Sequence, residues 1–156
     1  MTRLSYEKES VDRAGLLEFM RSQFWAVEAS ASASGDAQAA IIGFAVTDDF
    51  QIVFETLDST RKIRNLRQNP KIALVVGGWG AGDERTVQYE GLADEPQGAE
   101  LEGLKAIYAR RFPSGWTGRN WPGWVFVRVR PTWVRYSDFT HNPPSIMEFC
   151  TRDLMG

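Results

Sequence analysis

The most informative stretch of this sequence is Ile52-Val-Phe-Glu-Thr-Leu-Asp-Ser-Thr-Arg-Lys-Ile-Arg-Asn-Leu-Arg-Gln-Asn-Pro70. Its first residues are apolar and partly β-branched, which predicts a strand that ends at Thr56. A short turn follows, and the pattern predicts a helix that begins near Ser59. Because Pro70 disfavours a helical conformation at Asn69, we expect the helix to end there.

The start of this predicted helix carries two hydroxyl groups, Ser59 and Thr60, followed by two cations, Arg61 and Lys62. Cations at a helix N-terminus oppose the helix dipole by about 0.3–1 kcal/mol each. A bound dianion would reverse the sign of that effect. Backbone N–H groups, hydroxyls, a guanidinium and an ammonium together suit a terminal phosphate. The alternative is a solvated basic helix, since two more arginines follow in the same helix.

The composition indicates one globular domain over residues 1–156. Hydrophobic residues make up 43% and charged residues 24%, and the formal net charge of −2 gives no basic field of the kind that binds nucleic acid. The single cysteine, Cys150, excludes an intramolecular disulfide and a multi-cysteine metal site. No apolar run approaches the ~20 residues of a membrane span, and the polar N-terminus has no secretory pattern. We therefore expect a soluble, cytoplasmic protein.

Short strands and scattered helices are predicted on both sides of the central stretch. Ser10 is a candidate cap for a helix over residues 11–22, and another helix is expected after Pro96. Strands 39–46 and 51–56 are expected to form a hairpin, and the last two strands to be separated by Pro131. The fold class is therefore mainly β with flanking helices (α+β), built around a β-barrel. The predicted strands span residues 24–29, 39–46, 51–56, 72–76, 85–93, 124–129 and 132–136.

Several short motifs are spread along the chain: Phe54-Glu-Thr56, Thr60-Arg61-Lys62, Asn69-Pro70, Val87-Gln-Tyr-Glu-Gly91, Ile107-Tyr-Ala-Arg-Arg-Phe-Pro113 and the Arg-Pro-x-x-Val-Arg-Tyr run from Arg130 to Tyr136. Through these motifs the chain resembles the FMN-binding split barrel of the pyridoxamine 5′-phosphate oxidase superfamily (FMN, flavin mononucleotide) from about Val11 to Asp138. The resemblance implies a six-stranded antiparallel split β-barrel that binds FMN. It also implies a homodimer with the cofactor in grooves between the subunits.

The resemblance implies that the helix start holds the cofactor phosphate. Thr60, Arg61 and Lys62 match the family motif at this point, and Ser59 adds a hydroxyl beside them. Thr56 would contact the flavin or its ribityl chain. This part of the predicted site agrees with the phosphate site that the residue pattern suggests by itself.

Other parts of the cofactor site are implied to come from later strands. Thr86 and Gln88 would face the isoalloxazine ring or its tail. Trp133, or another late aromatic residue, would reach the flavin from the partner chain of the dimer.

The sequence departs from the oxidases at two places. The oxidases carry an Arg and a Lys on the strand that matches residues 39–46, and this chain has no basic residue there. They also use an Arg-x-His pair near the C-terminus to bind pyridoxal phosphate, where this chain has Arg135-Tyr-Ser137. These differences favour a relative of the oxidases over pyridoxamine 5′-phosphate oxidase activity itself.

A few further residues have both a functional and a structural interpretation. His141, the only histidine, is either a catalytic base or a surface residue. The glycine-rich run Gly77–Gly82 lacks the ending of a phosphate-binding P-loop and is interpreted as a hairpin loop. Trp116, Trp121 and Trp124 either pack in the core and the dimer or form a wall over the flavin.

Two function classes remain open at this stage. The first is an FMN-dependent oxidoreductase acting on a small molecule, in which the flavin carries the hydride chemistry. The second is a non-enzymatic carrier of flavin, haem or deazaflavin. A third hypothesis is a barrel that has lost its cofactor. The sequence shows no acid–base dyad, so it identifies no catalytic residue and no substrate.

Overall fold

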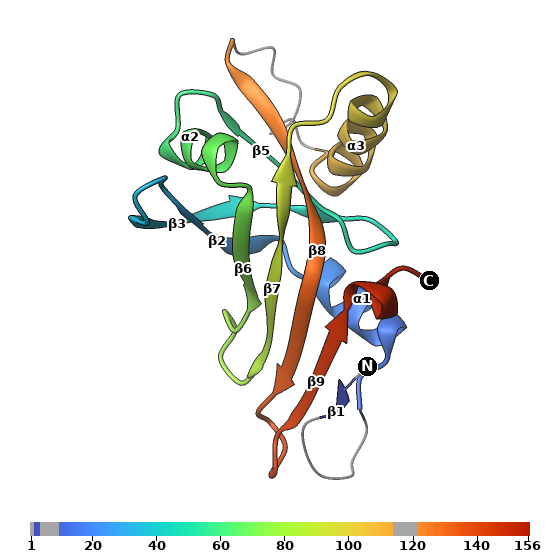
Figure 1. Ribbon diagram of the computed structural model, residues 1–156. Helices are drawn as coiled ribbons and strands as arrows, with labels where there is room; N and C mark the ends of the chain where they lie inside the picture. The colour runs from blue at the N-terminus through green and yellow to red at the C-terminus, as the bar shows by residue number, and fades with distance from the viewer. Residues whose placement is uncertain (1, 4–9, 114–121) are drawn as a thin grey trace.

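The computed structural model describes residues 2–3, 10–113 and 122–156. Figure 1 shows one curled antiparallel sheet whose long strands β6, β7, β8 and β9 run side by side, with α2 and α3 at one end. In chain order the elements are β1 (Thr2–Arg3), α1 (Arg13–Ser22), β2 (Trp25–Ala31), β3 (Ala37–Gly43), β4 (Ala45–Val46), β5 (Ile52–Leu57), α2 (Arg61–Gln68), β6 (Lys71–Gly77), β7 (Arg85–Asp94), α3 (Gly98–Arg111), β8 (Trp124–Asp138), β9 (Ser145–Cys150) and α4 (Thr151–Leu154).

The sheet is organised around β8, the longest strand. The strand order is β1-β9-β8-β7-β6-β2-β3, with β5 paired to β8 and to β4. One edge of β8 pairs with β7, while its other edge pairs first with β5 over residues 124–129 and then with β9 over residues 133–138. The sheet therefore curls at the point where β5 gives way to β9, as in a split barrel.

The predicted fold class, mainly β with flanking helices, is confirmed. The predicted strand number of six is too low, because the described residues form nine strands. β9 lies in a C-terminal stretch where no strand was predicted, and β1 and β4 contain two residues each. These two short strands pair with β9 and β5, respectively, and have too few residues to show a periodic pattern.

The hydrophobic core lies inside the curl. α1 buries Leu16, Phe19 and Met20 against it. Tyr89 on β7 is completely buried, and its hydroxyl lies 2.9 Å from the carbonyl oxygen of Phe50 and 3.0 Å from that of Val129. This phenol therefore ties the turn before β5 to β8 through a buried hydrogen bond.

Two predicted boundaries are wrong for local reasons. The cap of α1 is Asp12 and not Ser10, because the Asp12 carboxylate accepts a hydrogen bond of 2.8 Å from the N–H of Gly15. The predicted strand 39–46 is divided at Phe44 into β3 and β4. Only β4 forms the expected hairpin with β5, whereas β3 pairs with β2.

The predicted break at Pro131 does not occur, because β8 continues through it. A proline interrupts a sheet by lacking an N–H group. Pro131 lies between the segments of β8 that pair with β5 and with β9, so no ladder hydrogen bond is lost on that edge. On the other edge it faces Gly91, where the register between β7 and β8 shifts.

Other expectations agree with the structure. α2 buries Ile63 and Leu66 and ends at Gln68, next to Asn69-Pro70. β7 alternates as predicted, with Val87 and Tyr89 buried. Among the described residues, no helix has the length and apolar character needed to cross a membrane.

Gly91→Ala is expected to lower the free energy of unfolding by about 1–3 kcal/mol. A Cβ atom at this position would lie 2.5 Å from the carbonyl oxygen of Arg130 and 2.6 Å from Cγ1 of Val129. Chemical denaturation measures the change. The matched control is Gly103→Ala in α3, where a Cβ atom meets nothing within 4 Å and a gain of about 0.5–1 kcal/mol is expected. Equal stability of Gly91→Ala and the wild type would contradict the close approach.

Candidate functional site

A groove of about 460 Å³ opens where β5 ends and α2 begins. The ends of β2 and β3 form one side of it, and the C-terminal end of α3 forms the other. Its wall is largely aromatic, and its polar side chains gather on β5, α2 and α3. The aromatic lining residues are Phe24, Trp25, Tyr108, Phe112 and Trp124, and the polar ones are Glu55, Thr56, Thr60, Lys62 and Arg111.

Three of the residues predicted to bind the cofactor meet at one end of this groove. The Lys62 ammonium donates a hydrogen bond of 3.3 Å to the Thr56 hydroxyl, and the hydroxyls of Thr56 and Thr60 are 3.5 Å apart. Thr60 occupies the N-cap position of α2, but its side chain does not cap the helix, and the first turn contains no acidic residue. The helix start therefore presents uncapped N–H groups and a cation beside two hydroxyls.

The other two residues of the predicted phosphate site are exposed. Ser59 and Arg61 flank Thr60 at the start of α2 but are not part of the groove lining. Further along the helix, Arg67 forms ion pairs with two carboxylates, Asp58 at 2.6 Å and Glu95 at 2.8 Å. Arg61 and Lys62 have no such carboxylate partner among the described residues, which distinguishes the helix start from its end.

The later predicted residues lie on other parts of the sheet. Thr86 and Gln88 are on β7, and Gln88 is exposed and stands opposite Val75 and Arg135. Trp133 is half-buried on β8. None of these three side chains lines the groove of its own chain.

The end of α3 supplies much of the groove wall. The Arg111 guanidinium lies 3.6 Å from the centre of the Phe24 ring and donates a hydrogen bond of 2.6 Å to the carbonyl oxygen of Gln23. Burial lowers the pKa of Arg111. The rings of Tyr108 and Phe112 are 4.8 Å apart. These contacts pack the aromatic wall against the ends of β2 and β3.

Sequence reasoning did not assign these groove residues to the site. Trp25 and Arg111 are far from the phosphate motif in the chain and meet it only through the sheet pairing. The signal available was the motif Ile107–Pro113, which was recognised without a role. Of the three late tryptophans, Trp124 lines the groove, whereas Trp116 and Trp121 lie outside the described residues.

Two carboxyl groups near the groove have perturbed pKa values. Glu55 on β5 lines the groove, and burial raises its pKa to about 7. Glu28 on β2 is completely buried, and neither of its oxygens has a hydrogen-bond partner among the described residues. Burial raises the pKa of Glu28 to about 7, against the opposing effect of the Lys62 ammonium. Both residues were missed, although Glu28 is the only charged residue in the strand Trp25–Ala31.

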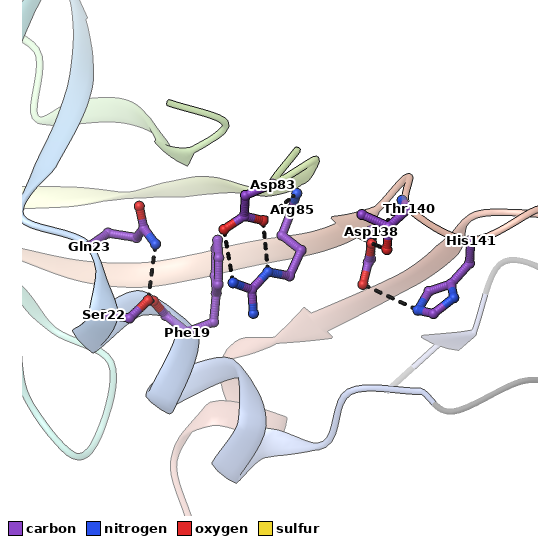
Figure 2. A network of polar contacts seen from close by, with 8 residues as sticks. All are labelled: Phe19, Ser22, Gln23, Asp83, Arg85, Asp138, Thr140 and His141. Atoms are coloured by element: carbon purple, nitrogen blue, oxygen red, sulfur yellow. Dashed lines mark hydrogen bonds and ion pairs between the residues drawn. The ribbon is translucent and has the colours of Figure 1, made fainter. Parts of the chain in front are cut away.

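The single histidine and the single cysteine lie away from the groove. Figure 2 shows His141 beside Asp138, with Nε2 3.4 Å from a carboxylate oxygen, and Arg85 stacked on Phe19 nearby. His141 is exposed, and Cys150 is exposed at the end of β9. The run Gly77–Gly82 joins β6 to β7, as expected of a hairpin loop.

Comparison with known proteins identifies the family. Residues 14–138 match the family described as pyridoxamine 5′-phosphate oxidase. The chain belongs to this family. The sequence has no match among curated proteins. The Thr-Arg-Lys helix start follows β5, in agreement with the family motif. In the Arg-Tyr-Ser segment, a guanidinium nitrogen of Arg135 lies 3.9 Å from a carboxylate oxygen of Glu148.

Solved structures with the same fold include FMN-binding and haem-binding proteins. A heme-binding protein from Mycobacterium smegmatis is 15% identical with a TM-score of 0.78, covering 95% of this chain and 62% of its own. This chain thus spans less than two thirds of that protein. The heme storage protein HutZ from Vibrio cholerae is 15% identical with a TM-score of 0.64, covering 76% and 88%. A pyridoxamine 5′-phosphate oxidase-related, FMN-binding protein from Nostoc punctiforme is 14% identical with a TM-score of 0.64, covering 88% of both chains.

Glu28→Gln is expected to remove a pH-dependent loss of stability. The pKa of Glu28 is about 7 in the folded protein and 4.5 as the ordinary value, so the protonated carboxyl favours folding below pH 4.5. That contribution is lost as the pH rises through 7. Between pH 5 and pH 8, the free energy of unfolding of the variant should therefore rise relative to the wild type by roughly 1–3 kcal/mol.

Urea denaturation at several pH values measures this difference. Glu18→Gln on the exposed side of α1 is the matched control for the loss of one carboxyl group. A difference between Glu28→Gln and the wild type that stays constant with pH would contradict a buried, perturbed carboxyl group.

Proposed function

We propose that this chain binds FMN in the groove at the start of α2 and uses it as an oxidoreductase acting on a small molecule. The observation that carries the proposal is the cluster of Thr56, Thr60 and Lys62 at the uncapped helix start, open to an aromatic groove. Family membership supports the same cofactor.

The chemistry of the groove suits a phosphorylated aromatic cofactor. Its volume of about 460 Å³ lies within the roughly 300–1,000 Å³ usual for cofactor pockets. Thr60, Lys62 and the neighbouring Arg61 would hold the phosphate, since hydroxyls, an ammonium and helix N–H groups all donate to it. Trp25 and Trp124 offer flat apolar surfaces for the ring system.

When bound, FMN supplies hydride transfer to and from organic substrates. The residues of the chain would bind and orient the cofactor, and the aromatic wall would exclude water from its ring. Glu55 is the carboxyl group in the groove lining, and its pKa of about 7 allows it to hold or release a proton near neutral pH.

We also propose that the groove is completed by a second copy of the chain. Next to the groove, β2, β3 and β6 carry an apolar face in which Val27 stands opposite both Ile41 and Val75. Ala29 extends this face, standing opposite alanines on both neighbouring strands. The exposed fraction is 65% for Ile41 on the edge strand β3 and 43% for Val75 on the inner strand β6, so this apolar face is open to solvent. A partner packed here would bring its own late strands, including Trp133, towards the groove.

A haem-carrier function is the second candidate, favoured by the structural similarity to heme-binding proteins. Protein ligands of haem iron include His, Cys, Met and Tyr. Among the described residues that line the groove, Tyr108 is the only one of these types. His141 and Cys150 lie elsewhere, so the groove fits FMN better. A cytoplasmic location is consistent with either function.

Replacing Arg61 and Lys62 together by Ala is expected to weaken FMN binding while leaving the fold intact. Each lost charge-assisted hydrogen bond should cost about 1.5–3 kcal/mol, or roughly 10- to 150-fold in the dissociation constant. Titration of flavin fluorescence measures the affinity. Arg64→Ala, exposed on the next turn of α2, is the matched control and should bind FMN as the wild type does. Unchanged affinity in the double variant would exclude this helix start as the phosphate site.

Val75→Glu is expected to convert the dimer to monomers, because it places a charge in the centre of the apolar face. Sedimentation velocity measures the change in mass. Ala109→Glu, at an exposed position of α3, is the control and should remain dimeric. A wild-type protein that sediments as a monomer would contradict the proposed dimer.

A further inference from the structure

Among the described residues, Glu28 makes no side-chain hydrogen bond that would explain why its carboxyl group is buried. The side chain is fully buried on β2, and both oxygens lack a hydrogen-bond partner among the described residues. Burying an unpaired carboxylate is costly unless the group takes up a proton or finds a nearby cation. The residue therefore stands out as a group whose charge depends on its surroundings.

Among the described residues, Lys62 of the proposed anion site is the cation that acts on Glu28. α2 packs on β2, and Asn65 of α2 donates a buried hydrogen bond of 3.2 Å to Ser30, two residues along the strand from Glu28. Lys62 is three residues before Asn65 and so lies on the same side of the helix. The Lys62 ammonium therefore acts on Glu28 through space, while it donates a hydrogen bond of 3.3 Å to the hydroxyl of Thr56.

The two residues that stand opposite Glu28 in the sheet, Ala40 of β3 and Leu74 of β6, carry no charge. Of the charged residues of α2, Lys62 is the one that acts on Glu28, and its effect lowers the pKa of the carboxyl. Glu55 on β5 lines the same groove, but its pKa is raised by burial alone.

We propose that Glu28 is a proton-binding site linked to the anion site, and that it takes up a proton from solvent when a dianionic phosphate binds at Lys62. This inference rests on the proposed function and adds a positioning residue to it. A single ammonium cannot neutralise both a buried carboxylate on one side and a phosphate dianion on the other. When the phosphate arrives, its negative charge opposes that of Glu28, and the carboxyl group becomes neutral by binding a proton.

The linkage has a definite sign. Without ligand, a pKa of about 7 leaves a part of Glu28 ionised at pH 7.5. Phosphate binding raises that pKa, so a fraction of a proton per bound ligand is taken up at this pH. The phosphate of FMN has a pKa near ~6 and is already a dianion, so its own titration releases protons on binding and cannot imitate this uptake.

Isothermal titration calorimetry of the full chain with FMN, at pH 7.5 in two buffers of different ionisation enthalpy, counts the protons directly. The wild type is expected to take up a proton fraction that Glu28→Gln loses while still binding FMN. Glu55→Gln is the comparison variant, because it removes the other perturbed carboxyl group near the groove, and it should keep the part of the uptake that belongs to Glu28. Lys62→Met, which does not alter the buried strand, should bind FMN more weakly and lose the uptake.

The outcomes separate this inference from the function on which it rests. FMN binding without proton uptake in the wild type, or uptake that persists in Glu28→Gln, overturns the role of Glu28 and leaves FMN binding intact. Uptake that disappears in Glu55→Gln instead assigns the proton to the groove carboxyl and also overturns it. Absence of any FMN binding overturns both proposals.

Discussion

The pairing of β8 with two different strands along one edge is the constraint on which the rest of the structure depends. β5 and β9 pair with the same edge of β8, β5 over residues 124–129 and β9 over residues 133–138. The sheet must curl at this point, and β5 ends on the rim of the curl instead of within a flat sheet. Because β5 ends there, the turn after it and the start of α2 open towards solvent, next to the ends of β2 and β3. The groove follows from this arrangement.

The electrostatics of the groove follow from the same geometry. α2 starts with cations and has no capping side chain, which costs stability in an isolated helix. Among the described residues, no carboxylate forms an ion pair with the cations at the helix start, whereas Asp58 and Glu95 pair with Arg67 at the helix end. An anionic ligand would supply the missing compensation. Glu28 on β2, against which α2 packs, is buried without a hydrogen-bond partner among the described residues. The positive charge of Lys62 therefore acts on this buried carboxyl group as well as on the groove.

Local patterns in the sequence predicted the parts of the fold that depend on neighbouring residues. The strand, turn and helix of residues 52–70 were predicted correctly because β-branched residues, hydroxyls and Asn69-Pro70 act over a few positions. The continuity of β8 through Pro131 was not predictable, since it depends on where two distant strands begin and end. The groove wall from α3 and the burial of Glu28 also arise from long-range pairing. Thr56, Thr60 and Lys62 could be grouped from the sequence because they are close in the chain, whereas Trp25 and Arg111, which line the same groove, could not.

The comparison of FMN with riboflavin, its counterpart without the phosphate, tests the central claim most directly. Equilibrium titration of the purified wild-type chain with each ligand, followed by flavin fluorescence and visible absorbance, measures both affinities. The account predicts about one FMN bound per chain and an affinity for riboflavin weaker by roughly tenfold or more, as the loss of a charge-assisted phosphate contact requires. Equal affinity for the two flavins, or no binding of either, would contradict it.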